Sequence, residues 1–196
     1  MIELKNVSIK YHNMFNSLTN VNLNLTKSTQ VVGDELFTSA FCRVLMNFDK
    51  YDGEVLIDGI NTKRIKNKDY PIAFVPKQDV LFNNWTARNN ILYSLEIRKF
   101  SKEEQDNAIN SLISTCKLDF LDKKAKYLTP AERKLTALLR AIIHKPKYLL
   151  IENMFDYEFG EYTDTITKLI ASIDNVIITT DKELNQFCSF KIISIV

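Results

Sequence analysis

The run Tyr148-Leu149-Leu150-Ile151 follows Pro146 and leads into Glu152 and Asn153. Four consecutive apolar residues are typical of a strand that is buried on both faces, as the strands of parallel sheets are. Strand and helix patterns alternate on both sides of this run. We therefore expect an α/β protein built around a parallel sheet.

The surrounding periodicities give the order of the elements. Residues 2–9 and 21–25 alternate apolar and polar residues, which predicts two half-buried antiparallel strands at the start of the chain. Ser101 and Glu104 form a capping box inside a helical region from 88 to 126. The other predicted strands are 28–32, 54–57, 72–75, 148–151, 176–179 and 191–196, and the other predicted helices are 38–48, 129–143 and 163–173.

Composition narrows the classes of function. The chain has 196 residues, with 26 Lys and Arg against 24 Asp and Glu, so no large field marks it as a nucleic-acid binder. No apolar run is long enough to span a membrane. Only four glycines occur, where average usage predicts roughly fourteen, which excludes several glycine-rich phosphate loops. Cys42, Cys116 and Cys188 are expected to be small buried residues of a cytosolic protein.

Several segments carry a resemblance to a known family. Gly33 follows a predicted strand, residues 52–59 read Asp-Gly-Glu-Val-Leu-Ile-Asp-Gly, and residues 74–82 read Phe-Val-Pro-Lys-Gln-Asp-Val-Leu-Phe. Further on, the helix pattern 128–143 leads into 146–153. In this order and spacing, nearly the whole chain resembles the nucleotide-binding domain of ABC transporters, from its P-loop and glutamine loop to its signature helix and Walker B strand.

The resemblance implies a fold and an organisation. The fold is an ABC-type P-loop NTPase-like core with an antiparallel β subdomain and a small helical subdomain. Residues 1–196 form one domain, in which 1–82 and 146–196 make the α/β core with its β subdomain and 83–145 make the helical subdomain. Members of this family pair head to tail around ATP and dock on a membrane permease, which places them in the cytoplasm at the inner face of the membrane.

The P-loop position departs from the family pattern G-x-x-x-x-G-K-[ST]. The chain reads Gly33-Asp34-Glu35-Leu36-Phe37-Thr38-Ser39-Ala40, with Ser39 at the lysine position and no hydroxyl at the next one. A working loop directs backbone NH groups and a lysine at the phosphates, and a hydroxyl at Mg²⁺. Here Asp34 and Glu35 repel a triphosphate. We expect a plain strand-to-helix turn, capped by Thr38 or Ser39.

The signature position keeps a helix start but loses its glycines. Where the family has LSGGQ, the chain reads Leu128-Thr129-Pro130-Ala131-Glu132. Thr129 and Glu132 match a capping box, and Pro130 suits the first helical position. Pro130 also removes one of the NH groups that would face a partner's γ-phosphate. The sequence thus predicts structure retained without the phosphate contact.

The Walker B and switch positions lack their usual catalytic residues. Glu152 is a weak candidate for a Mg²⁺ ligand, because one carboxylate without a P-loop hydroxyl or a phosphate makes a poor site. Asn153 stands at the position of the general base, and an amide does not accept a proton from water near neutral pH. Thr180 or Asp181 stands at the switch-histidine position. We therefore expect neither a catalytic residue nor a metal site.

The remaining nucleotide contacts are also reduced. Either Lys77 or Gln78 occupies the glutamine-loop position, and a lysine there would remove a neutral Mg²⁺ ligand. Tyr11 stands where the family stacks an aromatic ring on adenine. Stacking alone contributes about 1–3 kcal/mol, too little to hold ATP. If any nucleotide binding is retained, the residues expected to provide it are Tyr11, Gly33, Thr38 and Ser39.

Three further features lie outside these motifs. The histidines, His12 and His144, are expected at surface or capping positions. A polar turn carries the basic residues Lys63, Arg64, Lys66 and Lys68, which we interpret as a solvated loop rather than a site for nucleic acid or acidic lipid. Segment 77–95 corresponds to the surface that seats a membrane subunit's coupling helix in the family. Its aromatics, Phe82, Trp85 and Tyr93, indicate an interface if exposed and core if buried.

Together these residues favour a degenerate ABC-type ATPase-like subunit that does not hydrolyse ATP and needs no cofactor. It would act by binding a membrane permease subunit, an ABC ATPase subunit or a second copy of itself, and not nucleic acid. The alternative is a divergent active ABC transporter ATPase that binds MgATP through Tyr11 and Glu152 and powers transport.

Overall fold

The structure is a computed structural model that describes residues 1–9, 18–116, 118–156 and 158–194. Its first sheet is antiparallel in the order β2-β1-β4-β5, formed by β1 (Ile2–Ile9), β2 (Leu18–Leu25), β4 (Asp52–Ile57) and β5 (Ile60–Asn61). Gly53 brings β4 against β1 so closely that a Cβ there would lie 2.4 Å from the carbonyl oxygen of Asn6. The predicted antiparallel start is confirmed.

The second sheet is parallel throughout and has the order β6-β7-β8-β3-β9. Its strands are β3 (Thr29–Val32), β6 (Ile72–Val75), β7 (Tyr148–Glu152), β8 (Val176–Thr180) and β9 (Lys191–Ser194). Because all five strands run the same way, their carboxyl ends lie at one edge of the sheet. This edge carries most of the positions singled out by the sequence motifs.

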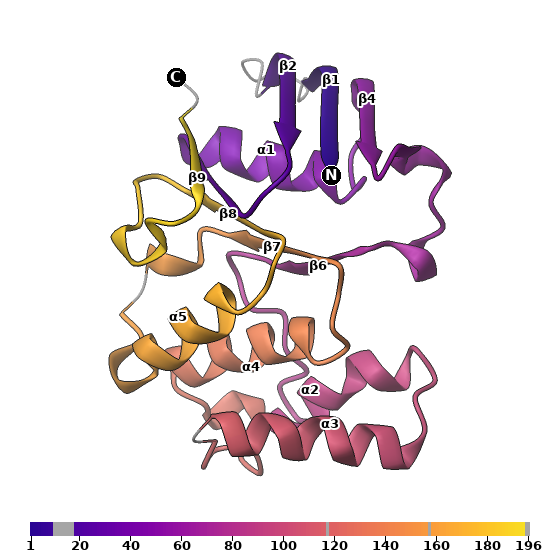
Figure 1. Cartoon of the computed structure of the whole chain (residues 1–196). Helices are drawn as coiled ribbons and strands as arrows, with labels where there is room; N and C mark the ends of the chain where they lie inside the picture. Colours follow the sequence, from indigo (N-terminus) through magenta and orange to yellow (C-terminus); the bar gives the residue numbers. More distant parts are fainter. Residues whose placement is uncertain (10–17, 117, 157, 195–196) are drawn as a thin grey trace.

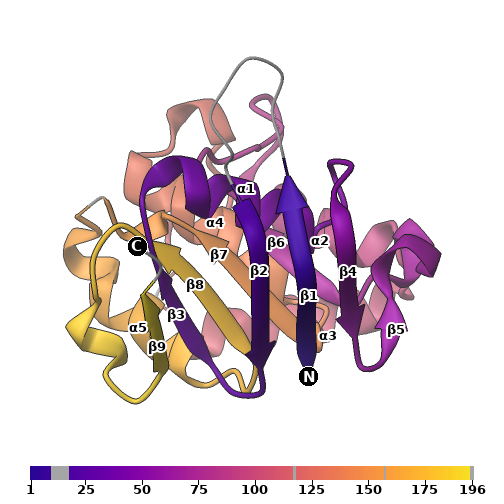
Figure 2. The same ribbon diagram turned by 90° about the horizontal axis from the view of Figure 1, so that it is seen from above.

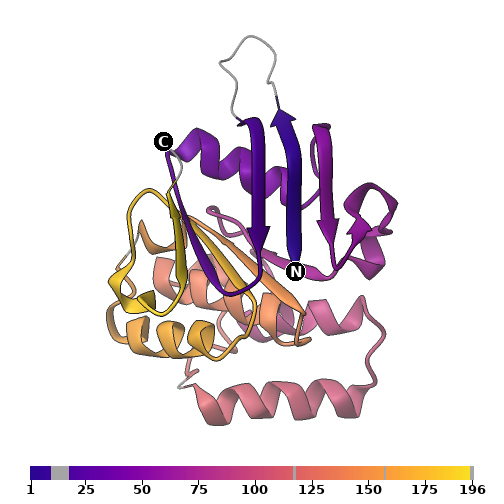
Figure 3. The same ribbon diagram turned by 45° about the horizontal axis from the view of Figure 1, so that its top comes forward.

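Helices cover both faces of the parallel sheet (Figures 1, 2 and 3). The α-helices are α1 (Glu35–Leu45), α2 (Ala87–Glu96), α3 (Lys102–Thr115), α4 (Pro130–Ile142) and α5 (Thr163–Ala171). Short 3-10 turns are η1 (Thr62–Arg64), η2 (Asn67–Asp69), η3 (Ala125–Tyr127), η4 (Met154–Asp156), η5 (Gly160–Tyr162) and η6 (Asn185–Phe187). Helix α1 lies between the two sheets, and α2 to α5 lie on the opposite side of the parallel sheet (Figure 1).

The two faces of β7 show why the apolar run defines this architecture. Tyr148 and Leu150 pack into one core with α1 and the antiparallel sheet. Leu149 and Ile151 pack into the other core with α2, α4 and α5. All four residues are buried, as a strand covered on both faces requires. The predicted α/β fold with a parallel sheet is therefore confirmed.

Two expectations differ from the structure. Helix α1 begins at Glu35 rather than near Thr38, so the helix starts three residues earlier than its apolar spacing indicated. Cys188 is exposed, whereas Cys42 and Cys116 are buried as expected.

Among the described residues, every helix is too short or too polar to cross a lipid bilayer.

Candidate functional site

The carboxyl ends of β3, β6, β7 and β8 meet at one edge of the parallel sheet. The amide of Gly33, directly after β3, donates to the carbonyl of Thr180 at 3.0 Å. The amide of Lys77, two residues after β6, donates to Oε2 of Glu152 at 3.2 Å. The P-loop, glutamine-loop, Walker B and switch positions are thus brought together, as the resemblance implies.

At the P-loop position, the backbone forms a helix start instead of an open loop. Asp34 is the N-cap of α1, and its Oδ1 accepts the amide of Phe37 at 2.7 Å. The amide of Thr38 donates to the carbonyl of Asp34 at 2.9 Å. The expectation that Thr38 or Ser39 caps this helix was wrong, because Asp34 offers a carboxylate at the right offset and Thr38 is buried inside the helix.

Thr38 and Asn153 connect the first turn of α1 to the end of β7. Asn153 Nδ2 donates to Thr38 Oγ1 at 3.2 Å, and that hydroxyl donates to the carbonyl of Glu35 at 3.2 Å. Thr38 is 0% exposed and Asn153 is 4% exposed. Asn153 has φ +39°, and its Oδ1 has no hydrogen-bond partner among the described residues. The position expected for a general base therefore holds an amide that bonds to the helix start.

Lys77 lies at the same edge of the parallel sheet and contacts residues from two other elements. Its Nζ forms an ion pair with Glu35 Oε1 at 2.8 Å, while its amide bonds to Glu152. The side chain of Gln78 is exposed. Of the two residues left open for the glutamine-loop position, Lys77 is the one that faces the P-loop position. The sequence carried no signal for its contact with Glu35, because the two residues are 42 positions apart.

Few side chains near Glu152 could serve as ligands for a metal ion. Among the described residues, no group of three or more His, Cys, Asp or Glu side chains could hold a metal ion. Thr180 uses its hydroxyl locally, donating to the carbonyl of Lys182 at 2.8 Å, and Asp181 is exposed. Burial raises the pKa of the neighbouring Cys42 thiol, which keeps it protonated and unreactive.

The signature position is a capped helix start. Thr129 Oγ1 accepts the amide of Glu132 at 3.2 Å, and Glu132 Oε2 accepts the amide of Thr129 at 2.7 Å. Pro130 is the first residue of α4, and Ala131 follows it, partly buried. The predicted capping box is confirmed. Glu132 also binds Lys123 at 2.9 Å, a contact that joins α4 to the turn before η3.

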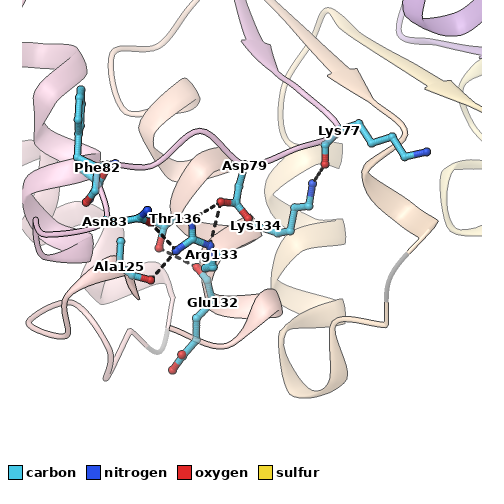
Figure 4. Close-up of polar contacts among 10 residues, drawn as sticks. Lys77, Asp79, Phe82, Asn83, Ala125, Glu132, Arg133, Lys134 and Thr136 are labelled. Atoms are coloured by element: carbon cyan, nitrogen blue, oxygen red, sulfur yellow. Dashed lines mark hydrogen bonds and ion pairs between the residues drawn. The ribbon is translucent and has the colours of Figure 1, made fainter. Parts of the chain in front are cut away.

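Helix α4 also fixes the segment that leads from β6 to α2 (Figure 4). Arg133 donates to Asp79 Oδ1 at 2.9 and 2.5 Å, to Asn83 Oδ1 at 3.2 Å and to the carbonyl of Ala125 at 2.6 Å. The ammonium of Lys134, which is buried, donates to the carbonyl of Lys77. The glutamine-loop position is therefore tied to the signature helix, directly through Lys134 and nearby through Arg133.

An aromatic cluster lies where this segment enters α2. Ring centroids of Phe82 and Trp85 are 4.5 Å apart, and Tyr93 stands edge-on to both at 5.0 and 5.6 Å. Phe82 is 42% exposed and Trp85 38% exposed, although both are large apolar side chains. From the sequence, exposed aromatics in this segment were expected to indicate an interface and buried ones to indicate core. The exposure of Phe82 and Trp85 therefore indicates an interface.

The other singled-out residues lie away from this edge or outside the described part. Tyr11 and His12 lie outside the described residues. Lys63 is held by the carbonyl of Tyr51 at 3.1 Å, while the other three basic residues of its turn are exposed. His144 was expected at a surface or capping position, and its side chain is partly buried. Burial, aided by the charge of Arg98, lowers its pKa to about 4.

Comparison with known proteins identifies the class and then the family. Solved ABC cassettes share the fold: the dimeric bacterial transporter cassette MJ0796 superposes with a TM-score of 0.85 at 24% identity, covering 100% of this chain and 94% of that one. The family model for ABC transporters matches residues 38–155. The chain belongs to the ABC transporter family.

Its relatives are import ATP-binding proteins. A probable sulfate/thiosulfate import ATP-binding protein, CysA, of Chlorella vulgaris is 30% identical over 160 residues, which covers 79% of this chain and 67% of the relative. The spermidine/putrescine import ATP-binding protein PotA of Lawsonia intracellularis is 26% identical over 166 residues. This chain spans 43% of the Lawsonia protein, less than half of its length.

Proposed function

We propose that this protein is an ABC-type subunit that does not hydrolyse ATP and that acts by binding other subunits of a transporter. On this proposal it works in the cytoplasm, at the inner face of the membrane, and has no catalytic residue. Its partners are a membrane permease subunit, an ABC ATPase subunit or a second copy. The alternative is a divergent but active ABC transporter ATPase that binds MgATP and powers transport.

The capped start of α1 is the observation that carries the proposal. A phosphate cradle needs convergent, unpaired NH groups at the end of β3. Here Asp34 satisfies the amides of Phe37 and Thr38 from within the chain. The carboxylates of Asp34 and Glu35 then occupy the helix N-terminus, where the helix dipole favours a negative charge and a triphosphate would otherwise bind.

The contacts of Lys77 and Asn153 support the same proposal. Lys77, whose amide bonds to Glu152, has its ammonium paired with Glu35. The hydroxyl of Thr38, in the first turn of α1, is buried and accepts a hydrogen bond from the side-chain amide of Asn153. A magnesium triphosphate needs a hydroxyl, a carboxylate and a lysine that are free to bind it. The residues at this edge do not fit that group.

Nucleotide binding provides the test. We expect isothermal titration calorimetry with MgATP and with MgADP to give no saturable heat up to millimolar nucleotide, and a phosphate-release assay to give only the rate without protein. The ADP-binding cassette MJ0796, titrated in parallel, shows that the assay works.

The opposite result is equally clear. Saturable MgATP binding in the micromolar range, or phosphate release proportional to the amount of this protein, would overturn the proposal in favour of the active ATPase. A Ser39→Lys variant serves as a charge control, because it restores one family residue while Asp34 still caps the helix. We expect this variant to remain unable to bind MgATP.

A further inference from the structure

A cavity lies at the amino-terminal edge of the parallel sheet, opposite the candidate functional site. It lies where α4 leads into β7 and where α5 leads into β8, and its third wall is α3, the helix farthest from the antiparallel sheet in Figures 1 and 3. Its volume is about 940 Å³, within the range of about 300–1,000 Å³ that is common for small-molecule sites. Only Ile109 of α3 is buried, so this helix covers the space without filling it.

Apolar side chains form much of the cavity wall. All three walls contribute them, and they are Phe100, Leu112, Ile142, Ile143, Leu169 and Ile173. Phe100 is 37% exposed, although it is a large apolar side chain. Apolar surface that faces water favours a ligand that removes it from water. We therefore expect the body of a ligand to be apolar.

Two helices end at this cavity. The C-caps of α4 and α5 are Ile143 and Ser172, and both residues line it. The carboxyl end of a helix carries the equivalent of roughly half a negative charge, which attracts cations. Arg140 and Lys168 lie in the last turns of these helices, but neither lines the cavity. The helix ends therefore favour a positively charged ligand.

The charged side chains of the wall favour the same sign. Glu104 lies on the α3 wall, and the hydrogen bonds of the α3 capping box hold its pKa below the ordinary value, so it stays charged. Among the described residues, the carboxylate of Asp174 has neither a hydrogen-bond nor an ion-pair partner. Of the two lysines that line the cavity, Lys147 is paired with Asp58 at 2.8 Å and Lys145 is exposed. Within the described part of the chain, two carboxylates without an ion-pair partner thus stand against one such lysine.

His144 adds a neutral hydrogen-bonding group to the same wall. Its Nδ1 is buried and has no hydrogen-bond partner in the part of the chain that the structure describes. Burial, the main cause, lowers its pKa to about 4, so the ring carries no charge near neutral pH. A neutral imidazole has one nitrogen that accepts a hydrogen bond. The ring therefore offers an acceptor for an N–H donor without repelling a cation.

We infer that this cavity binds an organic ammonium ion that carries an apolar body, as alkylamines and arylalkylamines do. The ammonium group pairs with Asp174 and Glu104, beside the carboxyl ends of the two helices. The apolar body packs on Leu112, Ile142 and Ile173. This inference goes beyond the proposed function, because the cavity lies at the other edge of the parallel sheet and shares no residue with the candidate functional site.

An organic carboxylate is the strongest competing ligand, because Lys145 would attract it. Both helix ends and two carboxylates of the wall oppose this ligand, since each would repel a negative charge. An apolar segment of a second copy of the chain would also cover the wall, but it would not need to carry a charge. Probes that differ only in charge separate these occupants.

Three matched probes test the sign of the charge. Phenylbutylamine, phenylbutanol and phenylbutanoate share one apolar body and differ in the charge of their polar end. Each is titrated into the full chain at pH 7, without nucleotide, by isothermal titration calorimetry. We expect saturable binding of the amine, binding of the alcohol that is weaker by about tenfold, and no saturable binding of the acid.

Substitutions then locate the bound amine. Asp174→Asn and Glu104→Gln should each weaken binding of the amine by about threefold to fivefold and leave the alcohol unaffected. Glutamine also completes a capping box, so Glu104→Gln keeps the start of α3. Ser111→Trp fills the cavity from α3 and should abolish binding of both probes. Asp106→Asn, which removes an α3 carboxylate outside the cavity wall, is the matched control and should change neither affinity. Circular dichroism verifies that each variant is folded.

Each contrary outcome overturns the inference. A lack of saturable amine binding at millimolar concentration would remove the cavity as an amine site. Equal affinity for the amine and the alcohol, or tighter binding of the acid, would show that the wall does not select a cation. Amine binding that survives Ser111→Trp would place the site elsewhere, and a dimer in sedimentation that dissociates in this variant would assign the cavity to a second copy. Because the titrations contain no nucleotide, this inference and the proposed function fail separately.

Discussion

The side-chain amide of Asn153 donates a hydrogen bond to the hydroxyl of Thr38 over 3.2 Å, which joins the end of β7 to the first turn of α1. In the family these two positions belong to the Walker B and P-loop motifs. Here they contact each other directly, inside a buried environment.

Asn153 adopts a left-handed backbone conformation, with φ +39°. Replacing it by Ala or by Gly removes the same hydrogen bond to Thr38, but only Gly adopts this conformation without strain. We expect both variants to be less stable than the native chain, and Asn153→Ala to be about 1 kcal/mol less stable than Asn153→Gly. Urea unfolding monitored by circular dichroism measures the difference, and equal stabilities would contradict it.

Asp34 stabilises α1 through its cap on the amide of Phe37. Asp34→Ala should lower the free energy of unfolding by about 0.5–2 kcal/mol, while Asp34→Ser should keep most of it, because a serine hydroxyl also caps. The exposed Asp181 supplies the control, since Asp181→Ala should change stability by less than about 0.5 kcal/mol. An Asp34→Ala protein as stable as its control would show that the cap contributes nothing.

Asp58 makes the folding stability of the protein depend on pH in the acidic range. Burial opposes its charge, but hydrogen bonds from Lys147, the terminal amine and Tyr148 outweigh burial and hold the pKa of this carboxyl well below its usual value. A lowered folded-state pKa stabilises the protein above the unfolded pKa near 3.8 and loses that effect as pH falls further. This carboxylate is partly exposed, so the contribution stays near that of a surface ion pair, about 1 kcal/mol or less.

Asp58→Asn tests this contribution without disturbing the backbone, because Asn tolerates the positive φ of this position. We expect the variant to be less stable than the native chain at pH 7. The two proteins should converge as the pH drops below 3. A difference that stayed constant from pH 7 to pH 2 would mean that packing, and not charge, explains it.

His144 should lower the stability at a higher pH than Asp58 does. Burial lowers its pKa to about 4, from an ordinary value of 6.5, so the unfolded chain takes up a proton at a pH where the folded protein does not. The free energy of unfolding therefore falls by up to about 1.4 kcal/mol for each pH unit as the pH is lowered from 6.5 to 4. His144→Gln removes this loss, so the variant should gain relative to the native chain between pH 7 and 5. Parallel urea titrations at both pH values would detect it.

Local patterns along the chain predicted much of the fold, because helix starts and buried strands depend on neighbouring residues. The capping boxes at Ser101 and Thr129 formed as expected, since each needs only a hydroxyl and a glutamate three residues apart. The start of α1 was misplaced because Thr38 or Ser39 was expected as its cap, whereas the carboxylate of Asp34 caps it. Thr38 is instead buried against Asn153, 115 residues away in the sequence, a contact that spacing along the chain does not predict.

The candidate site shows more clearly the difference between what residue identity predicts and what contacts between distant residues decide. From the sequence alone came the missing P-loop lysine, the missing signature glycines and the amide at Asn153, because these are matters of residue identity. Only the tertiary structure decided that Lys77 reaches Glu35, that Asn153 bonds to Thr38 and that Phe82 and Trp85 stay exposed beside Tyr93. Each of these depends on which side chains parallel strands and packed helices bring within a few ångströms, and spacing along one chain does not specify that distance.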